Sequence, residues 1–501
     1  MLSTVKRFPL VFLITILALF VSSFYLRLQF DFNAGHMDEY DYLFVGKHLL
    51  AGGTWPSHNY IFGSDVNWYL LGLGEQTFNG LEGARIVAGG FGLLSLLGIY
   101  WFVFSLWERH LTAFIATFLL STQSVQLFIS RFATYDVISF ACFTLALAPL
   151  IFACTKQERI KYAYLALAVL LMGLAILSKY VVILYLPVLA GIAFLHSRKI
   201  GLIFGAGVGG ILLAYGYLHW DALLVLYQDQ LQGVHGVGNS SAVFIIDIVF
   251  RYLAILLIIG LLAVLWSLQV GPKPFWKHSL FQKLPLLFLC AFPIIVYHLN
   301  ALNMIALVKH LVYAALFLVP IAAWILTNLV ELPNSRFAQP LAIFVVVGMC
   351  MTNYEQLRAL EQAYPDVTSV VEYAEKKLDA NDTILSEDPY LFRYLGATSI
   401  PQAQIKESGW LDNNHDGKHE HQDVIDAVWD RKFAFVFLND QLHPELNKKL
   451  RRILKSRSYD LVISKEYGTS DVMSQHTKGF LSLYKRSNGN NLSFNTGLQS
   501  W

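Results

Sequence analysis

The sequence is poor in charged residues and in cysteine. Charged residues make up 14% of its 501 positions, whereas hydrophobic residues make up 55%. Ordinary soluble domains carry about 25% charged residues, so this composition argues against a soluble protein. The four cysteines are scattered over apolar stretches, which gives no disulfide framework and no cysteine-based metal centre.

Three familiar patterns are also missing. No small-residue cleavage site follows the first apolar segment, so that segment is interpreted as a retained anchor rather than a signal peptide. No internal repeat divides the chain into matching halves, as many transporters show. No glycine-rich phosphate loop occurs in the polar C-terminal part, which argues against a nucleotide site there.

Long apolar runs dominate what is present. A helix needs about 20 mostly apolar residues to cross a bilayer. The runs predict about eleven membrane-spanning helices, near residues 8–28, 86–106, 111–129, 136–154, 162–178, 181–195, 199–218, 244–268, 284–298, 310–328 and 337–352.

Basic residues fix the expected orientation, because lysine and arginine accumulate in cytoplasmic loops. With a cytoplasmic N-terminus, the inner loops contain Lys6, Arg7, Arg109, Lys156, Arg159, Lys161, Arg198, Lys199, Lys273, Lys277, Lys283 and Arg336. An odd number of spans then places the C-terminal part outside. We expect a multi-pass protein of the plasma membrane, the inner membrane of a bacterium.

The C-terminal part differs sharply in composition from the rest. It is polar, and amphipathic helical patterns at 367–378 and 444–454 alternate with β-type runs at 383–385, 433–438, 461–463 and 480–484. This alternation predicts an extracytoplasmic α/β domain over 353–485, after a transmembrane domain over 1–352. Residues 486–501, rich in Ser, Asn and Gly, are expected to form a flexible tail.

An acidic cluster follows the first span, in the sequence Gly-His-Met-Asp-Glu-Tyr-Asp-Tyr from residue 35 to 42. Asp38, Glu39 and Asp41 are expected on the outer face, at the start of a large first loop over 29–85. A carboxylate pair at a membrane boundary can act as a base or as a ligand. The alternative is an ordinary solvated loop.

Cationic turns are expected on the same outer face. Arg131 and Asp136 flank one turn, Lys179 follows span five, and Lys309 and His310 precede span ten. An isolated interfacial lysine usually extends to the surface without further function. Three such turns beside carboxylates suit a lipid phosphate, whose charge lies at that depth.

Together these motifs resemble the membrane glycosyltransferases of the GT-C superfamily. The Asp38-Glu39 pair, Ala84-Arg85 at the end of the first loop, Arg131 to Asp136 and Gly173 to Lys179 carry the likeness over about residues 30–190. The protein O-mannosyltransferases and the bacterial aminoarabinose transferases that act on lipid A are the most similar groups. A weaker similarity extends from Lys309 to Pro320.

The resemblance implies an inverting transfer of a sugar from a polyprenyl phosphate to an acceptor hydroxyl. Asp38 would be the general base and Glu39 would support it. Arg131, Lys179 and His310 would hold the phosphate. The further residues expected at the substrate site are Tyr42, Asp65, Arg85, Asp136 and Lys309.

Two departures from these relatives concern the substrates. The first loop has Phe62 to Trp68 where relatives often have a Lys-Pro element, which shifts phosphate binding toward the other cations. Asp41 stands where the aminoarabinose transferases tend to have arginine, which argues against lipid A as the acceptor.

No obligatory cofactor is expected, although Asp38, Asp41 and Asp65 together could bind a divalent cation. A string of Asn, His, Asp and Glu over 413–421 invites a zinc site. Its polarity, its glycine and its lack of cysteine favour a solvated loop instead.

Two alternative classes stay open at this stage, a transporter or flippase for lipid-linked substrates and a scaffold without chemistry. A catalyst needs Asp38 itself, whereas a scaffold would tolerate asparagine there. The site residues of a transferase should converge around one cavity at the outer boundary. The sequence does not name the sugar, the lipid carrier, the oligomeric state or the acceptor, which is a glycolipid, a polysaccharide or a protein and not a nucleic acid.

Overall fold

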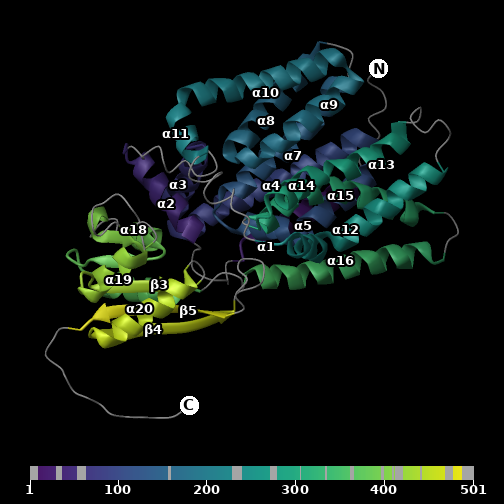
Figure 1. Cartoon of the computed structure of the whole chain (residues 1–501). Coiled ribbons are helices and arrows are strands. Elements are labelled where there is room, and N and C mark those ends of the chain that lie inside the picture. The colour runs from purple at the N-terminus through teal and green to yellow at the C-terminus, as the bar shows by residue number, and fades with distance from the viewer. Residues whose placement is uncertain are drawn as a thin grey trace. The chain divides into compact units, whose positions relative to one another are not determined.

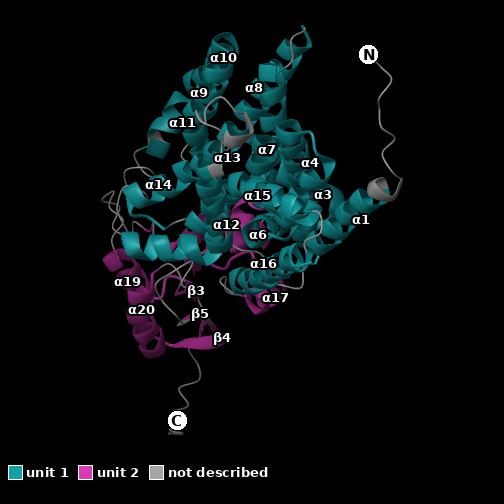
Figure 2. Cartoon of the chain, turned by 90° about the vertical axis from the view of Figure 1, so that its right-hand side faces the viewer, with its two compact units in different colours: residues 1–31, 45–361 teal, residues 32–44, 362–501 magenta. Residues whose placement is uncertain are grey.

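The computed structural model describes residues 10–29, 37–53, 64–155, 159–227, 240–270, 279–304, 306–332, 336–361, 366–395, 400–408, 411, 421–440, 443–468 and 478–487. These residues form helices over most of the chain and a small sheet toward its C-terminal end (Figure 1). They divide into two compact units, coloured separately in Figure 2. Unit 1 comprises residues 1–31 and 45–361, and unit 2 comprises residues 32–44 and 362–501.

The division between the units departs from a simple cut of the chain. Residues 32–44 cluster with the C-terminal part, so α2 (Met37–Leu50) contributes its first turns to unit 2 and its last turns to unit 1. At the other boundary, α16 (Ala338–Glu361) continues past residue 352, where the sequence predicts the transmembrane part to end. The expected flexible tail lies almost entirely outside the described residues, and so does most of the His- and Asp-rich string.

Unit 1 is helical throughout its described residues. It contains the last turns of α2 and the whole of α16. Its other described helices are α1 (Leu10–Arg27), α3 (Val66–Phe78), α4 (Gly80–Trp107), α5 (His110–Thr122), α6 (Ser124–Arg131), α7 (Tyr135–Thr155), α8 (Ile160–Ser178), η2 (Tyr180–Tyr185), α9 (Leu186–His196), α10 (Arg198–Leu218), α11 (Trp220–Val225), α12 (Ala242–Val270), α13 (Ser279–Cys290), α14 (Phe292–Ala301) and α15 (Leu307–Glu331).

Seven described helices are long and apolar enough to cross a membrane, and the number is eight if the bent pair α5–α6 counts as one span. Helices of this kind suit a bilayer because they satisfy their backbone hydrogen bonds internally. The predicted count of eleven is not confirmed. A helix occupies each predicted span, but the apolar helices at Ile14–Arg27 and Tyr180–His196 are shorter, and α16 is not among the seven.

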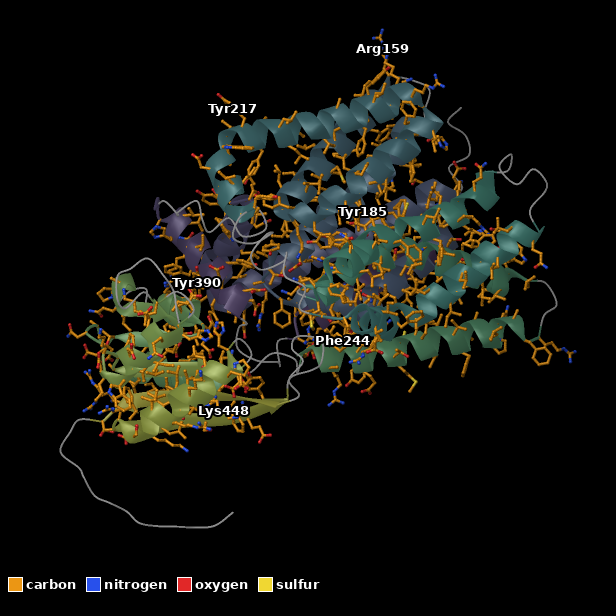
Figure 3. The ribbon with its side chains drawn as sticks, viewed as in Figure 1. Arg159, Tyr185, Tyr217, Phe244, Tyr390 and Lys448 are labelled. Atoms are coloured by element: carbon orange, nitrogen blue, oxygen red, sulfur yellow. The ribbon has the colours of Figure 1, made fainter. Side chains whose placement is uncertain are left out.

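Helix α15 forms the centre of unit 1. The apolar stretch of α15 is 94% buried, whereas that of α10 is 22% buried. Helix α15 is therefore enclosed by other helices, and α10 leaves much of its surface uncovered, as expected for a helix that faces lipid. Aromatic rings fill the space beside it: Tyr185, labelled in Figure 3, lies 5.7 Å from Phe317 and 5.1 Å from Phe143 between ring centroids. This packing fixes the N-terminal turns of α15, where Lys309 and His310 lie.

A sharp bend separates α5 from α6. The two helices meet at 62° around Gln123, whose backbone is extended at φ −67° and ψ 127°. The Gln123 side chain caps α6 by accepting a hydrogen bond from the Gln126 N–H at 2.8 Å. Every residue of α6 is buried. The break therefore carries a short helix, ending in Arg131, into the interior.

Unit 2 contains a mixed five-stranded sheet in the order β2-β1-β3-β5-β4. The strands are β1 (Ile384–Ser386), β2 (Ile405–Glu407), β3 (Phe435–Asn439), β4 (Tyr459–Gly468) and β5 (Lys478–Arg486). Strand β1 is parallel to both β2 and β3, and β5 is antiparallel to β3 and β4. The carboxyl ends of β1, β2 and β3 therefore share one edge.

Helices cover both faces of this sheet. One core contains side chains of α17 (Thr368–Lys377) and α18 (Pro389–Leu395) and also Tyr40 of α2. The core on the other face contains side chains of α19 (His421–Trp429) and α20 (Pro444–Ser456). Tyr40 lies 5.5 Å from Tyr394 and Phe44 lies 6.3 Å from Tyr390, between ring centroids. The first turns of α2 are thus an integral part of unit 2.

Candidate functional site

A buried ion cluster in unit 1 joins three of the residues that the sequence selects. Asp136, in the first turn of α7, accepts a hydrogen bond from the ammonium of Lys179. Lys309 Nζ lies 3.8 Å from the other Asp136 carboxylate oxygen. The Asp136 and Lys179 side chains are each 5% exposed and that of Lys309 is 13% exposed. Two ammonium groups therefore share one carboxylate away from solvent.

Both lysines of the cluster are suited to bind an anionic group. The Lys179 ammonium lies 5.0 Å from the centroid of the Tyr135 ring, a stabilising cation–π distance. Charge-assisted hydrogen bonds from ammonium groups are well suited to a phosphate.

Local backbone structure places the members of the cluster. Helix α8 ends at Ser178, and Lys179 follows in an extended conformation, donating its N–H to Ala175 O at 3.0 Å. Thr134 Oγ1 donates to Asp136 at 3.0 Å. The start of α7 carries partial positive charge, which favours a carboxylate in its first turn.

A hydrogen-bonded chain fastens the three helices around the cluster. The Tyr313 hydroxyl on α15 donates to Ser139 Oγ on α7 at 3.0 Å. Ser139 Oγ in turn donates to Ala175 O near the end of α8 at 2.7 Å. All three residues are buried. The helices that carry Lys309, Asp136 and Lys179 are therefore held in register within the apolar interior.

Arg131 ends α6, and its predicted role at the phosphate stays a prediction. Its guanidinium forms a buried ion pair with Glu361 at the end of α16 and donates a hydrogen bond to Gln29 O. The Arg131 side chain is 6% exposed and that of Glu361 is 17% exposed. Arg131 thus connects the end of α6 to the segments after α1 and at the end of α16.

A buried hydrogen-bond network connects α6 to the neighbouring helices. Arg27, fully buried at the end of α1, donates to Gln126 Oε1 and to Ser23 O. The Gln126 amide nitrogen donates to Ser95 Oγ at 3.0 Å and to Ser130 Oγ at 3.1 Å. Gln126 therefore links α6 to α1 and α4, one turn before Arg131.

Two further predicted residues lie near the same segments. Arg85, buried in α4, stacks over the ring of Phe132 at 5.5 Å from its centroid. Asp65 precedes α3, and its neighbours tie this helix start to α8: Ser64 N–H donates to Leu177 O at 2.7 Å and Asn67 Nδ2 to Ser178 O at 2.9 Å. Arg85 therefore borders the loop before Asp136, and Asp65 borders the end of α8 before Lys179.

His310 pairs with a second histidine, His298 of α14. His298 Nδ1 lies 2.7 Å from Asn303 O, and His298 Nε2 lies 2.8 Å from His310 Nδ1. A carbonyl oxygen only accepts, so His298 Nδ1 donates to it. In the neutral pair, His310 Nδ1 then donates to His298 Nε2. This series of hydrogen bonds leaves the lone pair of the neutral His310 ring on Nε2.

The acidic segment of α2 belongs to unit 2. Asp38 is half-buried, while Glu39 and Tyr42 are buried. Asp41, 8% exposed, lies within electrostatic range of Asp38 and also of Asp388, Glu407 and Arg393. Asp388 follows β1 and Glu407 ends β2, so both stand at the carboxyl edge of the parallel strands. The α2 carboxylates and this sheet edge form one acidic cluster in unit 2.

Burial shifts the titration of this acidic cluster. It raises the pKa of Asp388 to about 7, opposed by the hydrogen bond from the Leu391 N–H and assisted by the charges of Asp38 and Glu407. Burial also raises the pKa of Glu407 to about 6, against the attraction of Arg393. The pKa of Asp41 is raised well above its ordinary value by burial and then by the Asp38 charge. These carboxyl groups hold protons at a pH where exposed ones would not.

The structure joins some of the predicted site residues, while the convergence of Asp38, Glu39, Arg131, Lys179 and His310 around one cavity stays a prediction. Unit 1 joins Asp136, Lys179 and Lys309 directly and brings Arg85 and Asp65 to the adjoining segments. Asp38, Glu39 and Tyr42 belong to unit 2, so a common cavity with these cations stays a prediction. Sequence reasoning assigned no role to four residues near the predicted ones, namely Gln126, Glu361, Asp388 and Glu407.

The proposed divalent set also falls in both units, with Asp38 and Asp41 in unit 2 and Asp65 in unit 1. Over the part of the chain that the structure describes, there is no group of three or more His, Cys, Asp or Glu side chains arranged to hold a metal. A role for a divalent cation stays a prediction.

Family comparison supports the resemblance seen in the sequence. The model of the dolichyl-phosphate-mannose-protein mannosyltransferase family matches residues 12–203. This range includes the acidic segment of α2, the loop before Asp136 and Lys179. Comparison with curated protein sequences gave no significant match.

Solved structures share the fold over nearly the whole chain. The oligosaccharyltransferase AglB from Archaeoglobus fulgidus, in complex with an inhibitory peptide and a dolichol-phosphate, is 12% identical with a TM-score of 0.56, covering 95% of this chain and 75% of its own. ArnT from Cupriavidus metallidurans bound to undecaprenyl phosphate is 13% identical with a TM-score of 0.53, covering 94% and 97%. The apo state of ArnT gives 14% identity and a TM-score of 0.56.

These findings define the chain as a multi-pass membrane protein with the fold of the GT-C glycosyltransferases. The resemblance predicted from the sequence is confirmed. The family match is to the mannosyltransferases over residues 12–203, and the structural match to ArnT covers 94% of this chain.

Proposed function

We propose that this protein is an integral-membrane glycosyltransferase that moves a sugar from a polyprenyl-phosphate donor to an extracytoplasmic hydroxyl acceptor. The observation that carries the proposal is the buried cluster in which Lys179 and Lys309 share Asp136. Two similar structures were solved with lipid phosphates, a dolichol-phosphate and an undecaprenyl phosphate. A polyprenyl phosphate brings an anionic group that these two ammonium groups can bind. A transporter is not favoured, because the matches are to glycosyltransferases.

The proposed reaction is a single inverting displacement. The acceptor oxygen attacks the anomeric carbon while the bond from that carbon to the phosphate oxygen breaks. Asp38 accepts the hydroxyl proton, and Glu39 supports it. The polyprenyl phosphate leaves with the electron pair of the broken bond, and the sugar inverts its anomeric configuration.

Cations stabilise the charge that grows on the leaving phosphate. Lys179 and Lys309 bind its oxygens, and His310 donates to it when the ring is protonated at Nε2. Arg131, paired with Glu361, adds positive potential rather than a separate full charge. Tyr42, Asp65 and Arg85 border the substrates. The reaction needs no obligatory metal, although a divalent cation at the α2 carboxylates is compatible with it.

The proposed topology places this chemistry at the outer boundary of the plasma membrane. Eleven spans with a cytoplasmic N-terminus leave the loop that bears α2 and the α/β part outside. Because the first turns of α2 fold with the α/β part, unit 2 brings the base to the acceptor. The acceptor is a glycolipid, a glycan or a protein, and its recognition by unit 2 involves no nucleotide and no nucleic acid.

Reconstitution tests the proposal. The full chain is placed in liposomes with a panel of radiolabelled polyprenyl-phosphate sugars and with cell-envelope glycans and glycolipids as acceptors. We expect release of polyprenyl phosphate coupled to labelling of one acceptor class, and retention of activity in EDTA. Passage of intact lipid-linked sugar across the bilayer without cleavage would identify a transporter instead.

A further inference from the structure

A polar cavity lies beside the α5–α6 bend, away from the lysine cluster. Its volume is about 50 Å³, and its walls come from α5, α12, α15 and α16. The polar residues in the lining are Gln123, Arg251, Tyr252, Thr352, Asn353 and Gln356. None of these belongs to the proposed donor site, so the cavity requires its own explanation.

Three polar groups face this space without protein partners. Gln123 is 2% exposed; its Oε1 accepts from the Gln126 N–H, but its amide nitrogen has no hydrogen bond. The side chains of Tyr252 and Asn353 are 4% and 8% exposed and form no hydrogen bond to any described residue. Buried polar groups are normally paired, so the cavity is built to receive a hydrogen-bonding ligand.

The walls of the cavity are tied together by Gln356. Ser124 Oγ donates to Gln356 Oε1 at 2.7 Å, and Gln356 Nε2 donates to Arg251 O at 2.6 Å. These two bonds connect α6, α16 and α12 and leave the Gln356 amide occupied. The unpaired groups around it therefore stand in a fixed frame rather than in a loose gap between helices.

The ligand that fits is rich in acceptor oxygens. The Gln123 amide nitrogen only donates, Arg251 only donates, and Tyr252 and Asn353 can donate. Arg251 is 40% exposed and its ion pair with Asp247, at 2.9 Å, involves a carboxylate that is 57% exposed. Exposed pairs of this kind are weak, so Arg251 can turn toward an anion. A phosphate group matches both the donors and the size of the cavity.

The apolar surface beside the cavity suits a bound lipid. Asn353 and Gln356 follow the apolar run of 337–352, the last of the predicted spans, so head groups are expected at their level. On the adjoining surface, Phe250 and Ile258 of α12 are 52% and 54% exposed, and Val347 and Met351 of α16 are 49% and 67% exposed. Helices α12 and α16 are neighbours (Figure 1), and acyl chains along these residues would place a head group at the cavity.

We propose that this cavity binds the phosphate of an anionic phospholipid, with its acyl chains on α12 and α16. This goes beyond the proposed transfer and does not depend on it. The bound lipid would brace the α5–α6 bend through Gln123, which also caps α6.

Lipid titration of the purified full chain tests the assignment. The delipidated protein in detergent is titrated with dioleoyl phosphatidylglycerol, and binding is followed by native mass spectrometry and by thermal unfolding. We expect a one-to-one adduct and a rise in melting temperature. Gln123→Leu and Arg251→Gln should each weaken the affinity about tenfold, which is typical of losing one hydrogen bond to a charged group. Arg358→Gln, an exposed arginine of α16 outside the cavity, should leave the affinity unchanged.

Two other probes separate the sources of binding, and one variant guards against misfolding. Inorganic phosphate should bind far more weakly, because it lacks acyl chains, and dioleoylglycerol should bind far more weakly, because it lacks phosphate. Leu119→Phe, which fills the cavity without removing a polar group, should abolish the adduct in a folded protein. Equal binding of dioleoylglycerol, equal binding by all four variants, or water alone in the cavity of an experimental structure would overturn the proposal.

Discussion

At the level of single residues, Asp136 couples two lysines of the candidate site. One carboxylate faces Lys179 and Lys309, and all three side chains are largely withdrawn from solvent. Arg131 forms its own ion pair with Glu361. In the proposed binding of a phosphate, the two lysines therefore act together and not as independent cations.

Replacing Lys179 tests its proposed contact with the donor phosphate. Lys179→Met removes a charge-assisted contact worth about 1.5–3 kcal/mol, so we expect KM for the lipid-linked donor to rise about tenfold to hundredfold. The acceptor KM should change little. The exposed Lys448 of unit 2, replaced by Met in parallel, controls for loss of a lysine as such. An unchanged donor KM in the Lys179 variant would remove the phosphate from this position.

The acidic cluster of unit 2 predicts a pH-dependent stability. Burial raises the pKa of Asp388 to about 7 and that of Glu407 to about 6, so the folded state holds protons that the unfolded state loses near pH 4. The stabilisation is complete below about pH 4 and is lost as pH rises through about 7. Asp388→Asn, which mimics the protonated carboxyl, should therefore raise the melting temperature by a few degrees at pH 8 and hardly at all at pH 4. Equal effects at both values would show that Asp388 is ionised in the folded protein.

At the level of elements, the broken span α5–α6 places the site. The Gln123 cap starts α6, the Gln126 amide ties α6 to α1 and α4, and Arg131 ends it. The loop that follows contains Phe132 under Arg85 and leads directly to Asp136. A rigid α6 is therefore a condition for a correctly placed Asp136.

Gln126 can be tested as a positioning residue. Gln126→Leu leaves the buried Arg27 guanidinium without its side-chain acceptor, at a cost of about 1.5–3 kcal/mol in stability. Displacement of α6 should lower kcat at saturating donor as well as raise the donor KM. Gln126→Glu keeps the acceptor for Arg27 and should restore stability and part of kcat. A Leu variant that loses stability but keeps kcat and KM would assign Gln126 a purely structural role.

Local patterns made several of these elements predictable. The apolar runs located the helices of unit 1, and the β-type runs near 383–385, 433–438, 461–463 and 480–484 coincide with β1, β3, β4 and β5. Strand β2 was missed because its three residues, Ile-Lys-Glu, carry no β-type signal. The bend at Gln123 was missed although four polar residues, 121–124, interrupt the apolar run there, because one span was predicted across them.

At the scale of the whole molecule, contacts between residues distant in sequence could not be predicted from the sequence. Asp136, Lys179 and Lys309 were selected individually by sidedness, but their joining depends on how α7, α8 and α15 pack. Glu361 became visible only as the partner of Arg131, and the pairing of His298 with His310 likewise required the structure. The membership of the first turns of α2 in unit 2 likewise rests on the Tyr40 and Phe44 contacts, which no local pattern announces.

The central claim is that Asp38 is the base of a glycosyl transfer, and one substitution tests it most directly. Asp38→Asn keeps size and hydrogen bonding but removes the basicity that accepts the hydroxyl proton. In liposomes with the donor and acceptor identified by reconstitution, we expect the transfer rate to fall by about 10²–10⁴ while donor binding and the melting temperature stay unchanged. Asp430→Asn, on the exposed surface of unit 2, should retain full activity. Near-normal turnover by the Asp38→Asn protein would contradict the account and would point to an acceptor that is already ionised.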